Sequence, residues 1–253
     1  MAVGRVEINL SAKEKIYSLG FVIFILLFLQ FPCVLLYCES LLLQGQGLFP
    51  FDDSACLLCG LLEELGEGPE PARAYARLVA DSENSVGGFG AYEDVYVESA
   101  SELQETYEAV SVLARLGYAL NRERIEDFLN RFRQPDGGFG LHRSTLPSTY
   151  YACATLAQLP DRGPLMEGAR LYLQRRAQRW HVYFLDDVFW LVQGLSLTGS
   201  AAPCAANAAT HVLACQRPKG GFARAAAIGI PTLEHTYYAL QVLDSVGLLW
   251  GQG

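Results

Sequence analysis

The chain has 253 residues, of which 51% are hydrophobic and 18% are charged, and its formal net charge is −8 at pH 7. A chain of this length can bury a sizeable core, and this composition argues against intrinsic disorder. The excess of acidic residues and the lack of a basic stripe argue against nucleic acid as a partner.

The N-terminal part contains a long apolar run, residues 19–36, with no charged residue. A bilayer requires about 20 apolar residues, but Pro32 interrupts the run and a helix weakens before proline. Lys13 and Lys15 precede the run and favour a cytoplasmic N-terminus if it inserts. The sequence therefore leaves a membrane anchor and a helix packed on the fold as alternatives. A cleaved signal peptide is a third, although no small-x-small cleavage site follows.

Composition changes near residue 45, from a region rich in Ile and Phe to one rich in Ala, Arg and Gly. We therefore predict an N-terminal segment, residues 1–45, followed by a second domain, residues 46–253. This domain is expected in the cytoplasm, either free or associated with a membrane.

Seven cysteines are present, an odd number, and most lie in apolar helical stretches. This pattern predicts buried thiols in a reducing compartment rather than a disulfide framework. Cys56 and Cys59 form a CxxC pair inside an apolar run, with no second pair, which argues against a zinc knuckle.

Three short Gly-aromatic turns recur along the second domain, at residues 87–90, 137–140 and 220–222. Each follows an apolar helical pattern, which in residues 125–132 has the spacing i, i+3, i+4, i+7. Glycine at a helix C-terminus permits the left-handed conformation that ends the helix. We expect the Phe of each turn to anchor the loop in the core.

Five segments begin with a polar residue, end twelve positions later at Gly or Pro, and are apolar on nearly every face between. A helix that is apolar all round is a buried helix. Each unit is thus predicted to be an amphipathic outer helix, a Gly-rich turn and a buried inner helix. Such units of about 40 to 50 residues stack into an all-α solenoid or a closed αα barrel. The predicted inner helices are 54–66, 105–117, 148–160, 187–199 and 235–247.

The Gln-x-x-Gly-Gly-Phe turns, the inner helices beginning Thr-Tyr, and the stretch 213–240 resemble the β subunits of protein prenyltransferases. The resemblance covers about residues 40–250 and is greatest to the geranylgeranyl transferase type II β subunit. The squalene and terpene cyclases belong to the same superfamily. The resemblance implies an α-α toroid, in which six helix pairs surround an apolar, aromatic-lined funnel. Five pairs are recognisable, so the ring is open or is completed by the N-terminal segment.

The resemblance further implies that the funnel binds an isoprenoid or a prenyl diphosphate, and that an α-subunit-like protein is a partner. Cations are needed near the diphosphate, and aromatic residues of the inner helices would line the funnel. The candidate substrate-binding residues are His142, Arg143, Arg179, Tyr150, Trp190 and Tyr237. For the arginines, solvated charges on the outer helices are the alternative.

In that family an Asp, a Cys two residues later and a His bind zinc, and the fourth position stays open for substrate. His235 has the family's His-Thr context. Asp186 aligns with the family Asp, but Val188 then stands where the Cys belongs; a shift by two puts Asp186 at the Cys and Phe184 at the Asp. Asp187 is a candidate substitute, because the repeat register places it level with His235. We therefore predict an altered zinc site at Asp186, Asp187 and His235, with both aspartates as catalytic candidates.

Other interpretations remain open at the same residues. Polar residues at helix starts, namely Ser54, Glu105, Ser148, Asp187 and His235, are also typical of helix caps. Class II terpene cyclases carry Asp-x-Asp-Asp on the same fold, of which Asp186-Asp187 retains half. A non-catalytic toroid that binds a lipid or a protein is the further alternative, so the sequence leaves open whether the chain is an enzyme.

Overall fold

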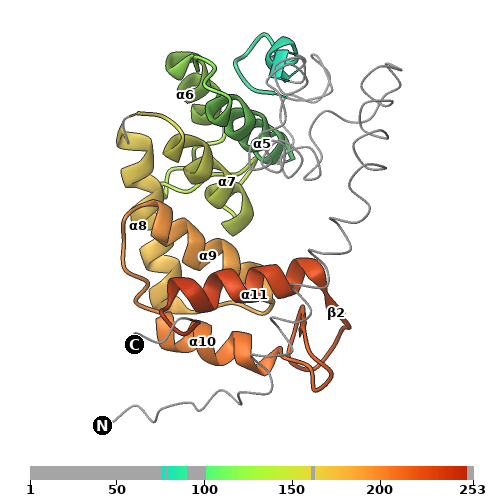
Figure 1. Ribbon diagram of the computed structural model, residues 1–253. Helices are drawn as coiled ribbons and strands as arrows, with labels where there is room; N and C mark the ends of the chain where they lie inside the picture. The colour runs from blue at the N-terminus through green and yellow to red at the C-terminus, as the bar shows by residue number, and fades with distance from the viewer. Residues whose placement is uncertain (1–75, 78, 90–100, 161–162, 250–253) are drawn as a thin grey trace, which may run out of the picture.

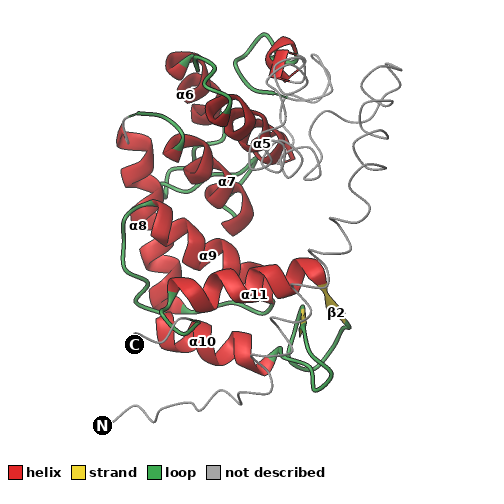
Figure 2. Cartoon of the chain, viewed as in Figure 1, coloured by secondary structure: helices red, strands yellow, loops and turns green. Residues whose placement is uncertain are grey.

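The computed structural model describes residues 76–89 except 78, residues 101–160 and residues 163–249 (Figure 1). Helices joined by loops are the main secondary structure of these ranges, as Figure 2 shows, and the only sheet in these ranges is the antiparallel pair β1 (Phe222–Ala223) and β2 (Pro231–Thr232). The prediction of an all-α fold is confirmed. Residues 76–77 and 79–81 are helical. The labelled helices are α5 (Ser101–Arg115), α6 (Arg122–Asn130), α7 (Leu146–Ala157), α8 (Gly163–Arg179), α9 (Leu185–Leu197), α10 (Ala205–Ala214) and α11 (Leu233–Ser245).

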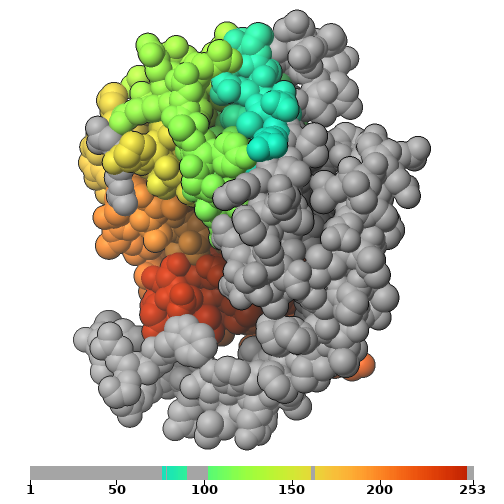
Figure 3. All heavy atoms as spheres, turned by 45° about the horizontal axis from the view of Figure 1, so that its top comes forward, coloured from blue at the N-terminus to red at the C-terminus, as the bar shows by residue number. Residues whose placement is uncertain are grey.

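The inner helices form one continuous layer, in which α5 packs on α7, α7 on α9, and α9 on α11. Helix α8 packs against α7 and α9, and α10 packs against α9 and α11, so each of these outer helices bridges two inner ones. Along the molecule the described chain runs broadly from α5 and α6 at one end to α10 and α11 at the other (Figures 1 and 3). This neighbour-to-neighbour packing is what stacked helix pairs require. Four of the five predicted inner helices are therefore present.

The first predicted inner helix, residues 54–66, and the N-terminal segment, residues 1–45, lie outside the described residues. The number of helix pairs and the closure of the ring therefore stay predictions. Within the described part of the chain, no helix is both long and apolar enough to cross a bilayer. The apolar run 19–36 lies outside the described residues.

The inner helices start earlier than the sequence pattern predicts. The N-cap residues of α7, α9 and α11 are Thr145, Phe184 and Thr232, so each helix begins two residues before its predicted start. The Thr145 and Thr232 hydroxyls accept the backbone N–H groups of Ser148 and His235, at 3.2 and 3.0 Å. Ser148 and His235, which the sequence offered as possible caps, thus lie three positions after the cap, where their own N–H groups are capped.

The predicted glycine terminators are confirmed for α5, α9 and α11. Gly117, Gly199 and Gly247 have φ angles of +72°, +72° and +75°, which is the left-handed region that glycine adopts at low cost. After each glycine, the next N–H bonds back to a carbonyl of the last helical turn, at 2.9, 3.0 and 2.8 Å. This arrangement satisfies carbonyls that the helix end would otherwise leave without donors.

The three Gly-aromatic turns have equivalent environments, which confirms the repeat. Their Phe side chains are 3%, 0% and 3% exposed. The backbone N–H of each Phe donates to a threonine hydroxyl in the first two turns of the following inner helix, at 3.0, 3.0 and 3.1 Å. Each turn is therefore attached to its own inner helix both by a buried ring and by a hydrogen bond. The pairs are Phe89–Thr106, Phe139–Thr149 and Phe222–Thr236.

Three of the seven cysteines lie in the described ranges, and Cys153, Cys204 and Cys215 are all buried free thiols. Burial raises the pKa of the Cys153 thiol to about 12, and it raises the pKa of the other two thiols as well. A thiol with a raised pKa is a poor nucleophile and a poor metal ligand at neutral pH. For these three residues the predicted structural role is supported.

Candidate functional site

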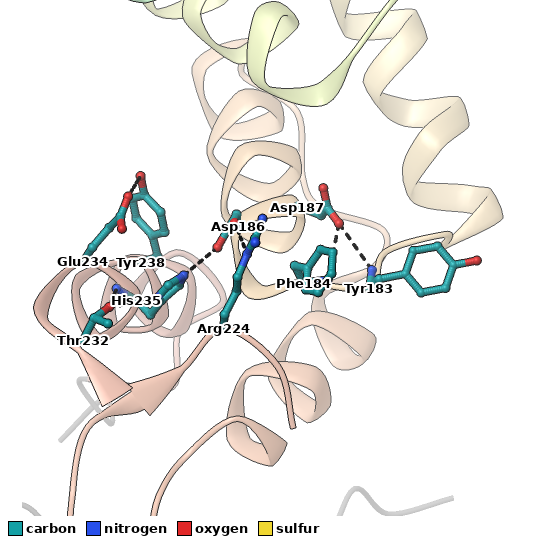
Figure 4. A network of polar contacts seen from close by, with 9 residues as sticks. All are labelled: Tyr183, Phe184, Asp186, Asp187, Arg224, Thr232, Glu234, His235 and Tyr238. Carbon is teal, nitrogen blue, oxygen red and sulfur yellow. Dashed lines mark hydrogen bonds and ion pairs between the residues drawn. The ribbon is translucent and has the colours of Figure 1, made fainter. Parts of the chain in front are cut away.

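Asp186 lies in the first turn of α9 and is only 7% exposed. Its Oδ2 atom accepts a hydrogen bond from Nε of Arg224 at 2.8 Å, and its Oδ1 atom lies 3.0 Å from Nε2 of His235 (Figure 4). Arg224 directly follows β1, and His235 lies in the first turn of α11. Two residues that lie 38 and 49 positions further along the chain therefore meet the Asp186 carboxylate, and we call these three residues the Asp186 triad.

The imidazole of His235 is held on both sides. Its Nδ1 atom lies 2.6 Å from Oγ1 of Thr232, the residue that caps α11. A carboxylate only accepts hydrogen bonds, so we assign the ring proton to Nε2, facing Asp186, with the Thr232 hydroxyl donating to Nδ1. The approach of Nε2 to Oδ1 has the distance of an ion pair without the alignment of a hydrogen bond. Oδ1 thus keeps capacity to accept.

Arg224 is attached to the start of α9 through its backbone as well as its side chain. Its carbonyl accepts the N–H of Leu185 at 2.8 Å, which satisfies one of the N–H groups that a helix start leaves free. Its guanidinium carbon lies 4.3 Å from the centre of the Phe184 ring, a cation–π distance. The side chain is 54% exposed, so the guanidinium also faces the surroundings.

Asp187 does not join the triad. Its Oδ2 atom accepts the N–H groups of Tyr183 and Phe184, each at 3.3 Å, so the carboxylate caps the start of α9 (Figure 4). Adjacent residues of a helix point about 100° apart, so Asp186 and Asp187 cannot both face His235. The expected grouping of all three residues is therefore not formed, and the capping alternative holds for Asp187.

The residues present do not fit a zinc ion of the family type. Val188, in the position of the expected Cys, is fully buried and has no ligand atom. Within the ranges that the structure describes, no three His, Cys, Asp or Glu side chains are grouped so as to hold a metal. The carboxylate of Asp186 already contacts a guanidinium and an imidazole. The donor set is thus one carboxylate and one imidazole beside a cation.

An unbroken series of aromatic rings leads from the triad along the inner helices. His235 meets Tyr238 edge-on at 6.3 Å, and Tyr238 stacks on Phe189 at 4.1 Å between ring centres. Phe189 contacts Tyr150 at 5.4 Å, and Tyr150 contacts Tyr107 at 6.3 Å. The rings come from α5, α7, α9 and α11, so one side of the inner layer is aromatic along its length. We call this series the aromatic face.

The hydroxyl groups of Tyr150 and Tyr238 on the aromatic face stay neutral at physiological pH. Burial raises the pKa of Tyr150 and of Tyr238 above the usual value of 10, and the neighbouring tyrosines raise it further. Tyr238 also donates a hydrogen bond to Oε1 of Glu234 at 3.1 Å. The face therefore presents apolar rings with neutral polar tips.

The structure places the predicted substrate-binding residues in different surroundings. Tyr150 is part of the aromatic face. The ring of Tyr237 contacts that of Phe189 at 6.3 Å between ring centres, and Tyr237 is 55% exposed. Trp190 is half-buried, and its indole N–H has no acceptor among the described residues. These three positions on α7, α9 and α11 remain candidates for ligand contact.

The predicted cations lie apart from the Asp186 triad. His142 and Arg143 are exposed in the loop before α7. Arg179 lines a separate cleft of about 670 Å³ together with Arg175 and Arg176 of α8 and with residues of the second Gly-Phe turn. None of the residues that line this cleft belongs to the triad. The solvated-charge alternative therefore fits their exposure.

Sequence reasoning missed Arg224 and most rings of the aromatic face. Arg224 follows the third Gly-Gly-Phe turn, and a charged residue beside that turn was the available signal. Tyr107, Phe189 and Tyr238 all lie on predicted inner helices, where an aromatic side chain points either to the core or to the aromatic face. Helical periodicity alone does not separate these two directions when a helix is apolar all round.

Comparison with known proteins places this architecture. A family model described as the prenyltransferase alpha-alpha toroid domain matches residues 55–179 and 172–250. No curated protein matches the chain. A solved structure of Candida albicans protein geranylgeranyltransferase-I complexed with GGPP is similar, with 17% identity and a TM-score of 0.47. That match covers 63% of this chain and 55% of that one, so this chain spans about half its length. Because the family model covers well over half of the chain, the protein belongs to the prenyltransferase alpha-alpha toroid family.

Proposed function

We propose that the aromatic face binds the hydrocarbon chain of an isoprenoid or a prenyl diphosphate, with the polar end of the ligand at the Asp186 triad. The observation that carries this proposal is the continuity of the ring contacts, from Tyr107 on α5 to Tyr238 on α11, where they meet His235. A prenyl diphosphate matches this arrangement, because its long apolar chain ends in one polar group.

Each end of such a ligand has a favourable contact in the structure. Burial of apolar surface contributes about 25 cal/mol per Å², so a long hydrocarbon chain laid on aromatic rings gains several kcal/mol. At the polar end, the guanidinium of Arg224 is half-exposed and pairs with Asp186 through Nε. A guanidinium has five N–H donors, so others remain for a phosphate oxygen.

The proposal is binding by a prenyltransferase β-subunit-like protein, with an α-subunit-like chain as the expected partner. It includes no transfer step, because the residues around Asp186 do not supply the zinc site on which transfer to a thiol depends in the family. The cyclase alternative finds no support in the geometry either. Asp186 faces a guanidinium and an imidazole, and Asp187 faces the start of α9, so the two carboxylates do not act as a pair.

Titration with a fluorescent analogue of geranylgeranyl diphosphate tests the proposal. We expect saturable binding, weakened about 2- to 12-fold by Phe189→Leu, which corresponds to the loss of one aromatic contact of about 0.5–1.5 kcal/mol. The matched control is Phe132→Leu: this side chain is also buried, but it packs against Phe128 of the outer helix α6. Equal affinities for the two variants, or no saturable binding by the wild-type chain, would refute the proposal.

A second candidate is a non-catalytic toroid that binds a protein or a lipid surface through its rim. The observation that favours it is a group of exposed apolar side chains between β1 and the second turn of α11. Each of these exposes more than half of its surface: Ile228, Ile230, Leu233 and Tyr237. Exposed apolar groups of this kind are typical of interaction surfaces. A variant with Ile228 and Ile230 both changed to Ser would lose such binding and would keep prenyl diphosphate binding.

A further inference from the structure

We infer that Arg224 supplies the positive charge that a metal ion would otherwise supply to Asp186 and His235, so that this pair is held together without zinc. The inference goes beyond ligand binding. It concerns contacts within the chain and holds whether or not the aromatic face binds an isoprenoid.

The first observation is the state of the Asp186 carboxylate. Its side chain is 11% exposed, and both of its oxygens have a close neighbour, Arg224 at 2.8 Å and His235 at 3.0 Å. A buried carboxylate needs a cation or several hydrogen-bond donors near it. Arg224 meets this need completely, since one guanidinium balances one carboxylate. A metal ion at Oδ2 would have to displace the guanidinium.

The second observation is that Arg224 is positioned by its backbone rather than by its partner alone. The Ala223 N–H bonds to the Cys215 carbonyl at 3.0 Å, and the Arg224 carbonyl accepts the Leu185 N–H at 2.8 Å. The Phe184 ring then covers the guanidinium at 4.3 Å. These contacts set the side chain beside Asp186 before any ligand arrives, as a metal ion would be set by its ligands.

The third observation is that the two neighbouring residues of α9, Asp187 and Val188, supply no further metal ligand. Val188 lies one helical turn after Phe184, the N-cap residue of α9. Its side chain is fully buried and offers only methyl groups. Asp187 is engaged by the N–H groups of Tyr183 and Phe184. A divalent ion between Asp186 and His235 would therefore gain two ligands and would repel the adjacent guanidinium. The carboxylate of Asp186 is therefore better matched to the guanidinium of Arg224 than to a zinc ion.

The test measures zinc content and thermal unfolding of the full chain after dialysis against zinc and then against metal-free buffer. The variants are Asp186→Asn and Arg224→Gln. Arg170→Gln is the matched control, because Arg170 forms an exposed ion pair with Glu167 on the outer helix α8. Comparison between variants removes any zinc held elsewhere in the chain, for example by Cys56 and Cys59.

We expect Asp186→Asn to leave the zinc content unchanged and Arg224→Gln to lower the melting temperature by about 2–4 °C, against no change for Arg170→Gln. The inference is overturned if Asp186→Asn loses one equivalent of zinc. It is equally overturned if Arg224→Gln leaves the melting temperature as unchanged as Arg170→Gln does. Neither measurement uses a prenyl ligand, so failure here is distinct from failure of the proposed function.

Discussion

The Nε atom of Arg224 donates a hydrogen bond to Oδ2 of Asp186 across 2.8 Å, although the two residues are 38 positions apart in the sequence. This contact joins the segment after β1 to the first turn of α9. The same carboxylate faces His235 on α11, so the last two helix pairs meet there. Because the Arg224 side chain is about half exposed, the ion pair itself contributes modestly to stability. Its main effect is to fix the orientation of three polar side chains at one end of the aromatic face.

Thr149 links the second Gly-Phe turn to α7, and its loss should be costly. Its hydroxyl, which is fully buried, accepts the Phe139 N–H at 3.0 Å. Thr149→Val keeps the shape but leaves a buried N–H without an acceptor, which costs about 1–3 kcal/mol. Urea unfolding followed by circular dichroism gives the value. Thr210→Val, on the exposed face of α10, should change stability by no more than about 0.5 kcal/mol. Similar losses for the two variants would contradict the structural role of the turn.

Gly137 and Gly117 both have positive φ angles, +88° and +72°, but they differ in the space around them. A Cβ atom at Gly137 would lie 2.5 Å from the carbonyl oxygen of Gly168, whereas a Cβ at Gly117 would meet nothing within 4 Å among the described residues. Gly117→Ala should cost about 1–2 kcal/mol for the left-handed conformation alone. Gly137→Ala should cost clearly more, because backbone has to move. Equal urea midpoints would mean that the turn and α8 do not pack as described.

Glu105 should make stability depend on pH. Burial raises the pKa of its carboxyl group above the usual value of a glutamate. The folded chain then binds this proton more tightly than the unfolded chain, so its contribution to stability is present at low pH and is lost as pH rises through the folded pKa. Glu105→Gln should therefore raise the melting temperature at pH 7 and have little effect near pH 4.

The control for this experiment is Glu123→Gln, at the exposed first turn of α6. A negative charge there is favourable to the helix, so its removal should lower stability slightly at pH 7. The two substitutions are thus expected to have opposite signs at neutral pH. A destabilising Glu105→Gln at pH 7 would show that its carboxylate is stabilised in the fold.

The parts of the fold that depend on local sequence were predictable. Gly199 was identified as the end of α9 because glycine readily adopts the left-handed conformation that ends a helix. Phe139 was identified as a buried anchor because it directly follows the Gly-Gly pair of its turn. The starts of α7, α9 and α11 were predicted two residues late, because a polar residue three positions after a cap, such as Ser148 after Thr145, resembles a cap itself.

The candidate site was predictable only in part. Asp186 and His235 were identified through the family resemblance, and the structure brings them together. The repeat register also placed Asp187 level with His235, but the level along a helix does not fix the direction around it. Arg224 was missed because its partner is distant in the chain and no periodicity connects the two.

The central claim is that the aromatic face holds an isoprenoid chain, and photoaffinity labelling tests it most directly. A prenyl diphosphate analogue with a diazirine group on its hydrocarbon chain would be bound, irradiated and mapped by peptide mass spectrometry. The account predicts labels on α7, α9 and α11, centred on Tyr150, Phe189 and Tyr238, which are suppressed by unlabelled prenyl diphosphate. Labels confined to the outer helices α6, α8 and α10, or labels that unlabelled ligand does not suppress, would contradict it.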